Sequence, residues 1–469
     1  MKSIQLLNPL VLLCTIACAS NNTPAPPAGD KLSSTVEQAS KDTFEHGKII
    51  SPVYCKNDAT QSYAIYIPLT RRSGPLPVVY FFDPHGNGSL PLANYQSLAD
   101  KYQFIFIGSN NSKNGNDGNL SEKIWTTLYD DSKTRFQIDP DRVYTCGFSG
   151  GGKMACFVAL QHPEVKGVIA NSGAIPEMAS LNLSFCYTAL AGEGDMNMTD
   201  LVAINNQLDK STNRHRIILF NGKHEWAPIT TMNIALAGIE LDAMYKKLVP
   251  TDDSFIKSYT DSSKKRISAF LKTNNYLKAQ AECDISISFL EGLPGDIAWF
   301  KQENMQIKND NRFQKQSQAR QHWLVTEDNW KSEFSKHFQT VDMNYWDKTI
   351  ADLKSKAALQ SGEGAMNARL LAYLSLAFYS ISNQLINSNR NQDAQYFVDL
   401  YKLADPTNSE AWYFSAILDA RNRNAVTTNA DLLKAVSNGF NDASRMKQQP
   451  EFVTMQIDFR AIENKMLKN

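Results

Sequence analysis

The sequence lacks an excess of charge of either sign. Lysine and arginine together number 48, and so do aspartate and glutamate, so the formal net charge at pH 7 is zero. The sequence also lacks a basic run with interleaved aromatic residues. Such a chain has no global field that would draw nucleic acid or an acidic membrane surface. Nucleic acid is therefore not expected among its partners.

Cysteine is scarce as well, and its spacing excludes the common zinc patterns. Seven cysteines occur in 469 residues, with no C-x-x-C pair and no Cys/His spacing typical of a metal site. No bound metal is therefore expected. Two of the seven fall in the N-terminal segment, and the other five permit one disulfide whose connectivity the sequence does not determine. Cys146 and Cys156 flank a glycine-rich serine and are expected to pack as small apolar residues.

The N-terminal apolar run, Ile4–Ala19, is too short and too interrupted to span a bilayer core of about 30 Å. A lysine precedes it, which is the layout of a secretory signal. Its end, T-I-A-C, resembles a bacterial lipobox, so residues 1–18 are expected to be a lipoprotein-type signal with Cys18 as the lipidation site. A lipid anchor in the bacterial cell envelope follows, at the outer membrane or the periplasmic face, and plain cleavage with secretion is the alternative. Residues 19–40, polar and proline-rich, predict a flexible tether.

The chain has room for two or three domains, and its character changes near Thr251. Before that point, short apolar runs alternate with amphipathic segments. Several runs are apolar on consecutive residues, as expected for strands that are covered on both faces. This alternation predicts a mostly parallel α/β sheet in a domain over residues 41–250. The expected strands lie within 62–68, 77–83, 104–108, 142–147, 167–171, 186–192 and 216–222.

Residues 251–469 show helical periodicity instead and predict an all-α domain. The apolar residues at three- and four-residue steps are Met366, Leu370, Leu374, Phe378, Ile381 and Leu385. Further on, a helix ending at Ala404, a D-P-T-N turn and a helix carrying Ala411–Tyr413 resemble the joint between tetratricopeptide repeats. Such repeats stack helical hairpins of about 34 residues into a curved array. A nonspecific helical bundle is the alternative.

Ser149 stands between Gly147 and three consecutive glycines, Gly150–Gly152. Glycine inside a strand or helix costs about 0.5–1 kcal/mol relative to alanine, so four here indicate that the local backbone geometry requires them. The spacing G-x-S-x-G, after an apolar strand and before an apolar helix, is typical of a nucleophile elbow. A phosphate-binding turn is the alternative, but the spacing fits neither the Walker motif nor G-x-G-x-x-G. Ser149 is therefore the candidate nucleophile.

A serine nucleophile needs a base and an acid, and the order Ser, Asp, His places both downstream. Among seven histidines, His224 follows the last expected strand on a loop that precedes a helix. Asp195 stands just beyond the strand ending near residue 191, with Glu193 and Asp200 as competitors for the acid. The acid would orient the imidazole and stabilise its protonated form.

The segment His85–Gly88 directly follows an early strand, where an oxyanion hole is expected together with the N–H after the nucleophile. The expected donors are the backbone N–H groups of Gly86 or Asn87 and of Gly150. His85 is expected to shape this loop or to contact substrate. Trp226 and the asparagine-rich segment Ser109–Asn119 are candidates to line a polar substrate pocket.

Together, H-G-N-G, the elbow, G-E-G-D-M-N and G-K-H-E-W-A-P resemble the secreted esterase group that includes polyhydroxybutyrate depolymerase-like and feruloyl esterase-like enzymes. The resemblance covers about Tyr63–Pro250 and implies an α/β-hydrolase domain with Ser149, Asp195 and His224 as its triad. The sequence departs from the pattern in two places. Asp-Pro precedes the H-G pair where an apolar residue is usual, and three glycines follow the serine where Ala-Gly-Gly is commoner.

The expected function is therefore that of a serine carboxylesterase that works through an acyl-enzyme and needs no cofactor. A small-molecule or glycan-linked ester, such as an acylated carbohydrate, is the expected substrate. A peptidase of the same fold is one alternative. The other is a surface binding protein whose helical half recruits a protein partner while the hydrolase domain is vestigial.

Overall fold

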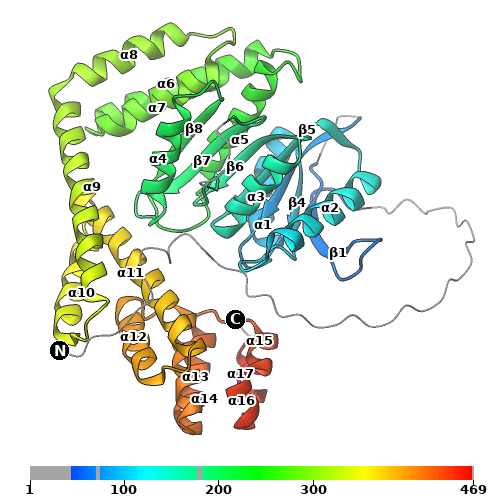
Figure 1. Ribbon diagram of the computed structural model, residues 1–469. Coiled ribbons are helices and arrows are strands. Elements are labelled where there is room, and N and C mark those ends of the chain that lie inside the picture. Colours follow the sequence, from blue (N-terminus) through cyan, green and yellow to red (C-terminus); the bar gives the residue numbers. More distant parts are fainter. Residues whose placement is uncertain (1–43, 70–73, 177–181, 467–469) are drawn as a thin grey trace, which may run out of the picture. The chain divides into compact units, whose positions relative to one another are not determined.

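The computed structural model describes residues 44–69, 74–176 and 182–466. The expected signal and most of the expected tether, Cys18 included, lie outside these residues. The described chain divides near Gln318 into two compact units (Figure 1). Within the described ranges, no helix combines the length and the apolar character that a membrane span requires.

The first unit is built on one eight-stranded sheet with the order β1-β2-β4-β3-β5-β6-β7-β8 (Figure 1). The β1–β2 and β2–β4 pairs are antiparallel, and all the other neighbouring strands are parallel. All seven expected strands are present, and β1 is an edge strand that the sequence did not predict. The strands are β1 (Ile49–Tyr54), β2 (Ser62–Tyr66), β3 (Leu76–Phe82), β4 (Ile105–Ser109), β5 (Ile138–Phe148), β6 (Val165–Asn171), β7 (Cys186–Gly192) and β8 (His215–Phe220).

Helices cover both faces of this sheet. On β5, the Thr145 hydroxyl donates to the Ala155 carbonyl of α3 at 3.0 Å. Its neighbours Tyr144 and Cys146 belong instead to the apolar core that includes α1 and α5. Because successive side chains of a strand point to opposite faces, α3 lies on one face and α1 and α5 on the other. These helices are α1 (Ser89–Tyr102), α2 (Gly118–Arg135), α3 (Gly150–Gln161), α4 (Met198–Leu208) and α5 (Ile229–Tyr245).

Three further helices, α6 (Asp253–Lys272), α7 (Tyr276–Leu290) and α8 (Ile297–Asn309), also belong to the first unit. The domain boundary expected at Pro250 therefore moves to about Gln318. Phe289 of α7 is fully buried, and a Cβ on Gly238 of α5 would lie only 1.8 Å from its ring. These helices have helical periodicity because they complete the core of the α/β unit, and this periodicity does not mark a separate domain.

Polar contacts join α7 to the sheet and to α5 as well. Arg214 donates to the Asp242 carboxylate of α5 at 2.5 Å and to the Phe289 carbonyl of α7 at 2.6 Å. Arg216 of β8 donates to the same carboxylate at 2.5 Å. Because these groups lie at the surface that α7 covers, removal of α7 would expose both apolar and charged atoms of β8 and α5.

The five cysteines of the described chain are buried and free. Cys146 and Cys156 are both fully buried, as expected of residues that pack as small apolar groups. Burial raises the pKa of Cys156, so its thiol stays protonated. The disulfide that the sequence permitted does not form among these residues.

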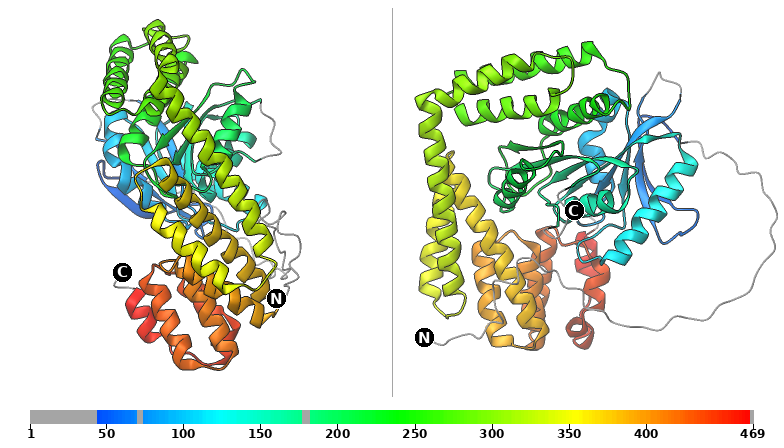
Figure 2. Two further views of the ribbon diagram at one scale, coloured as in Figure 1. Left: turned by 90° about the vertical axis from the view of Figure 1, so that its left-hand side faces the viewer. Right: turned by 45° about the horizontal axis from the view of Figure 1, so that its top comes forward.

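The second unit is all-α, as expected for the C-terminal half, and begins within α9 (Asn311–His337). Its consecutive helices from α10 to α14 pack against one another in chain order (Figure 2). The six residues predicted to share one helix face are all buried on α11. The remaining helices are α10 (Met343–Ala357), α11 (Gly362–Asn387), α12 (Asn391–Ala404), α13 (Ser409–Arg421), α14 (Ala425–Ser437), α15 (Ala443–Gln448), α16 (Pro450–Thr454) and α17 (Arg460–Met466).

The expected turn between α12 and α13 is present. Helix α12 ends at Ala404, and the Asn408 side chain caps α13 by accepting the Glu410 N–H at 3.1 Å. Trp412 of α13 donates its indole N–H to the Pro406 carbonyl at 2.8 Å. The turn is therefore fixed to the helix that follows it. Membership of the tetratricopeptide class stays a prediction.

Substitution of Phe289 by alanine should destabilise the first unit by about 3–5 kcal/mol, since a buried aromatic ring is lost. Native-state hydrogen exchange of the sheet amides would measure this, because it reports the stability of that unit by itself. Met305→Ala is the control: this side chain of α8 is 60% exposed, so its loss should change stability by less than about 0.5 kcal/mol. Equal effects of the two substitutions would contradict the place of α7 in the core.

Candidate active site

Ser149 occupies the turn between β5 and α3 in a strained conformation. Its φ is 55° and its ψ is −120°, a combination that non-glycine residues rarely adopt. The Ser149 N–H donates to the Asn171 carbonyl at the end of β6, at 2.8 Å. Backbone strain of this kind persists only where the surrounding structure enforces it, and such strain clusters at functional sites.

The glycines around Ser149 are required by close backbone approaches. A Cβ on Gly147 would lie 2.0 Å from the Gly151 carbonyl oxygen. A Cβ on Gly151 would lie 1.9 Å from the carbonyl oxygen of Phe82, the last residue of β3. The start of α3 is thus pressed against both β5 and β3, and the Ser149 side chain is held at the carboxyl edge of the sheet.

The structure brings Ser149, His224 and Asp195 into one hydrogen-bonded line. The distance from Ser149 Oγ to His224 Nε2 is 2.9 Å, and that from His224 Nδ1 to Asp195 Oδ1 is also 2.9 Å. The three residues follow the carboxyl ends of β5, β8 and β7, respectively. Carboxyl ends of parallel strands meet at one edge of a sheet, which explains how residues far apart in sequence come together.

Asp195 is better placed for this contact than its two competitors. It is fully buried, and its Oδ1 also accepts the Asn197 N–H at 2.9 Å. Its Oδ2 meets no hydrogen-bond donor among the described residues. Glu193 instead pairs with Lys278 of α7 at 3.0 Å, and Asp200 lies in the first turn of α4. Of the three acids, the structure places Asp195 against His224.

The expected oxyanion donors differ in their environment. The Gly86 N–H donates to the Asp83 carbonyl at 3.1 Å and is therefore engaged in its own turn. This contact corrects the expectation for Gly86. Gly150 is the first residue of α3, where amide groups have no acceptor inside the helix. Asn87 and Gly150 are therefore the better candidates.

Trp226, expected in a substrate pocket, makes extensive contacts within the protein. Its indole N–H donates to the Asp83 carboxylate at 3.0 Å. Its ring packs against Phe148, with centroids 5.6 Å apart, and against Tyr95, with centroids 6.1 Å apart. The His85 side chain, by contrast, is 78% exposed, although its Nδ1 lies 3.6 Å from Asp83.

Two residues near the site were not singled out by sequence reasoning. Asn114 belongs to the asparagine-rich segment, and its Oδ1 lies 1.8 Å from where a Gly150 Cβ would stand. The Asn114 N–H donates to the Pro84 carbonyl at 2.8 Å, which links this segment to the loop after β3. Asp83 is the second, and its only signal was the departure from an apolar residue before the H-G pair.

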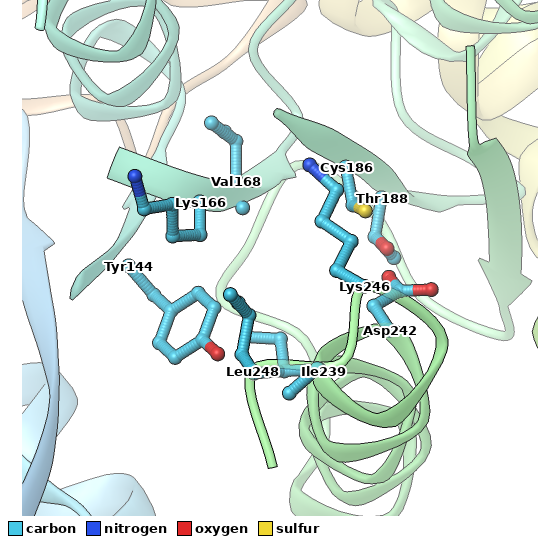
Figure 3. Close-up of a pocket in the computed structure, with 11 residues that line it drawn as sticks. Tyr144, Lys166, Val168, Cys186, Thr188, Ile239, Asp242, Lys246 and Leu248 are labelled. Carbon is cyan, nitrogen blue, oxygen red and sulfur yellow. The ribbon is translucent and has the colours of Figure 1, made fainter. Parts of the chain in front are cut away.

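A separate small pocket lies at the other end of the sheet. Its lining includes Tyr144 of β5, Lys166 of β6, Cys186 of β7 and Asp242 of α5 (Figure 3). Lys166 and Cys186 stand at the amino ends of their strands, whereas the serine, histidine and aspartate follow carboxyl ends. This pocket is therefore distinct from the candidate active site.

No family model and no curated protein matches this chain. Among solved structures it is similar to an esterase of Pyrobaculum calidifontis, with 12% identity over 44% of this chain and 86% of the other, at a TM-score of 0.35. It is also similar to a fluorophosphonate-binding serine hydrolase of Staphylococcus aureus, with 12% identity over 42% of this chain and 99% of the other, at a TM-score of 0.35. A ferulic acid esterase is 15% identical over 40% of this chain and 94% of its own, at a TM-score of 0.31.

The fold class follows from the chain's own topology. An eight-stranded sheet of this order, antiparallel only at β1 and β2, with a G-x-S-x-G turn after β5, is that of an α/β-hydrolase. An all-α unit follows it. The positions of Ser149, Asp195 and His224 along the chain agree with the residue order of that fold.

Replacement of Gly151 by alanine should destabilise the first unit by about 1–3 kcal/mol, because the new Cβ forces the elbow away from β3. Gly118→Ala is the matched control: Gly118 begins α2, and a Cβ there would meet nothing within 4 Å. This control should be neutral or stabilising by up to about 1 kcal/mol. Hydrogen exchange of the sheet amides measures both, and an unperturbed Gly151 variant would refute the close packing.

Proposed function

We propose that this chain is a serine hydrolase that cleaves acyl esters through an acyl-enzyme. The observation that carries the proposal is the line from Ser149 through His224 to the buried Asp195, with 2.9 Å at each step. A nucleophile, a base and an orienting acid within hydrogen-bond reach of one another are the signature of nucleophilic catalysis by serine.

The reaction would begin with attack of Ser149 Oγ on the ester carbonyl carbon. His224 Nε2 takes the hydroxyl proton, and the carbonyl electron pair moves onto oxygen to give a tetrahedral intermediate. The intermediate collapses, the bond to the alcohol oxygen breaks, and His224 returns the proton to that oxygen. Water, deprotonated by His224, then attacks the acyl-serine. The second tetrahedral intermediate collapses, the bond to Ser149 Oγ breaks, and His224 returns the proton to Oγ as the acid leaves. No cofactor is needed in this sequence of steps.

The negative charge on the tetrahedral oxygen needs fixed donors. We assign this role to the N–H groups of Asn87 and Gly150, with the N-terminus of α3 adding a favourable dipole. Asp195 would hold His224 in the tautomer that accepts the proton on Nε2, and would stabilise the imidazolium that forms. Its complete burial supports this role, since charge interactions are stronger away from water.

A carboxylester is the proposed substrate, and an acylated carbohydrate is the proposed natural class. The exposed His85 and the asparagine-rich segment, with Asn114 beside Gly150, offer polar groups that suit a hydroxyl-rich ligand. A peptidase of the same fold is ranked lower because the sequence shows no acidic cluster for a substrate amine. A vestigial hydrolase domain is ranked lower because the strained Ser149 and the aligned His224 are both retained.

Ser149→Ala should abolish labelling by a fluorophosphonate probe and hydrolysis of short p-nitrophenyl esters, because the attacking oxygen is removed. Labelling is read by gel fluorescence on the full chain, with circular dichroism to confirm that the variant is folded. Undiminished labelling of this variant would refute Ser149 as the nucleophile.

Hydrolysis of p-nitrophenyl esters also tests which residue is the acid of the triad. Asp195→Asn should lower kcat about 10⁴-fold, the loss expected when the imidazole is held in the wrong tautomer. Glu193→Gln is the matched control, since Glu193 pairs with Lys278 and not with His224. If the control loses more activity than Asp195→Asn, the acid has been assigned to the wrong residue.

For the chain as a whole we propose a lipid-anchored protein of the bacterial cell envelope. The anchor would be attached at Cys18, and the all-α unit would hold a protein or glycan partner, as concave repeat arrays do. The support for the anchor is the T-I-A-C sequence, and the support for the partner is the turn that joins α12 to α13 between Ala404 and Ser409.

Metabolic labelling with a fatty-acid analogue should tag the wild type, whereas Cys18→Ser should stay untagged because it lacks the thiol to which the lipid is attached. Mass spectrometry of the mature N-terminus gives the independent readout. An unmodified N-terminus beginning after Cys18 would show plain secretion instead.

A further inference from the structure

The Asp83 carboxylate joins the loop that contains His85 to the loop that contains Trp226, without belonging to the triad. Asp83 follows the last residue of β3 and is only 2% exposed. Its Oδ1 accepts the His85 N–H at 2.9 Å, and its Oδ2 accepts the Trp226 indole N–H at 3.0 Å. A buried charge is costly unless it is hydrogen-bonded, so these donors are needed to keep the carboxylate in place.

One side of Asp83 shapes the oxyanion loop. The side chain holds the His85 N–H, and the Asp83 carbonyl accepts the Gly86 N–H at 3.1 Å. Asn87, the proposed donor, is the next residue along the chain. Asp83 therefore accepts two hydrogen bonds from the turn, and these bonds fix the position of the Asn87 N–H.

The other side of Asp83 reaches the histidine loop. Trp226 lies two residues after His224, and both rings pack on Phe148, with centroid distances of 5.6 and 4.8 Å, respectively. Phe148 immediately precedes Ser149. A shift of the Trp226 ring would therefore displace Phe148 and, with it, both His224 and Ser149. The Asp83 carboxylate fixes that ring by accepting its indole N–H.

Both partners of the carboxylate are N–H donors, and this explains why the residue is an aspartate. A carboxylate offers two acceptor oxygens, whereas an asparagine offers one acceptor and an NH₂ group that would face a donor. Burial by itself raises the pKa of Asp83, but the hydrogen bonds from His85 and Trp226 outweigh it and lower the pKa below its usual value. The group is therefore ionised at neutral pH.

We propose that Asp83 is a positioning residue that fixes the oxyanion loop relative to the Ser149–His224 pair through its bonds to His85 and Trp226. The inference rests on the proposed esterase function. It also gives a physical reason for the aspartate of the Asp-Pro pair that precedes H-G. The role differs from that of Asp195, because the carboxylate of Asp83 bonds to His85 and Trp226, whereas that of Asp195 bonds to the His224 imidazole.

Asp83→Asn keeps the shape of the side chain but satisfies only one of the two donors. It should lower kcat for p-nitrophenyl acetate about 100-fold, the cost of about 1 Å of misplacement. KM should change much less. Affinity for a short alkyl trifluoromethyl ketone, which forms a tetrahedral adduct with a reactive serine, should fall by a similar factor, since this adduct needs the oxyanion donors.

Trp226→Phe removes the same hydrogen bond from the other side. If both residues act through this one hydrogen bond, the double variant Asp83→Asn/Trp226→Phe should lose no more activity than the more damaging single substitution. Asp131→Asn is the control, because Asp131 is also buried and also accepts hydrogen bonds at both oxygens, from the Lys56 N–H and the Tyr63 hydroxyl, both at 2.8 Å, besides its ion pair with Arg135 at 3.0 Å. It should lower the melting temperature and leave kcat and ketone affinity unchanged.

Two results would overturn the inference while the proposed function stands. One is an Asp83→Asn enzyme whose kcat and ketone affinity stay within twofold of the wild type. The other is a loss of kcat that tracks the melting temperature equally in the Asp83 and Asp131 variants, which would show a merely structural role. A wild type that neither hydrolyses esters nor reacts with the fluorophosphonate would overturn the proposed function and this inference together.

Discussion

The close approach of Gly151 to the Phe82 carbonyl is the constraint on which the rest of the site depends. It fixes the start of α3 against β3 and leaves Ser149 at a φ of 55°, between two strands and a helix. From that position the serine hydroxyl meets His224, and Asn114, which is hydrogen-bonded to the loop after β3, lies beside Gly150 at the start of the helix. A single glycine thus relates Ser149 to the strand that carries the proposed oxyanion loop. Any side chain at Gly151 would have to move β3 and this loop with it.

Most of this arrangement could be read from the sequence, because its signals are local. The strands covered on both faces are runs of apolar residues, and the elbow needs glycines at fixed spacing around Ser149. Parallel strands then bring the ends of β5, β7 and β8 to one edge, so the order of the strands and the residues that follow them were sufficient to nominate His224 and an acid in the loop that contains Asp195. The choice of Asp195 over Glu193 was a weaker prediction from sequence, because both residues lie in the same loop. The geometry separates them, since Glu193 is drawn away by Lys278.

What the sequence did not reveal depends on long-range contacts. Helices α6–α8 have the same periodicity whether they form their own domain or cover a sheet, and the contacts of Phe289 with Gly238 and of Arg214 with the Phe289 carbonyl decide the matter. In strand β1 the exposed Ser51 and Pro52 interrupt the apolar residues, so the sequence shows no continuous apolar run there. The bond from Trp226 to Asp83 joins residues more than a hundred positions apart. Similarly, the Gly86 N–H was expected to face substrate, but its turn partner became visible only in three dimensions.

The place of α7 in the first unit also bears on the order in which the protein is made. Synthesis proceeds from the N-terminus, so the ribosome completes the segment that contains Ser149, Asp195 and His224 well before Phe289 and Ile307 are added. The apolar core that includes these last two residues also includes Leu236 and Ile218, on the helix and the strand that flank the histidine loop. Until the later helices arrive, α5 and β8 lack their cover. The nascent chain consequently reaches its compact form late, after every residue of the proposed triad has been translated.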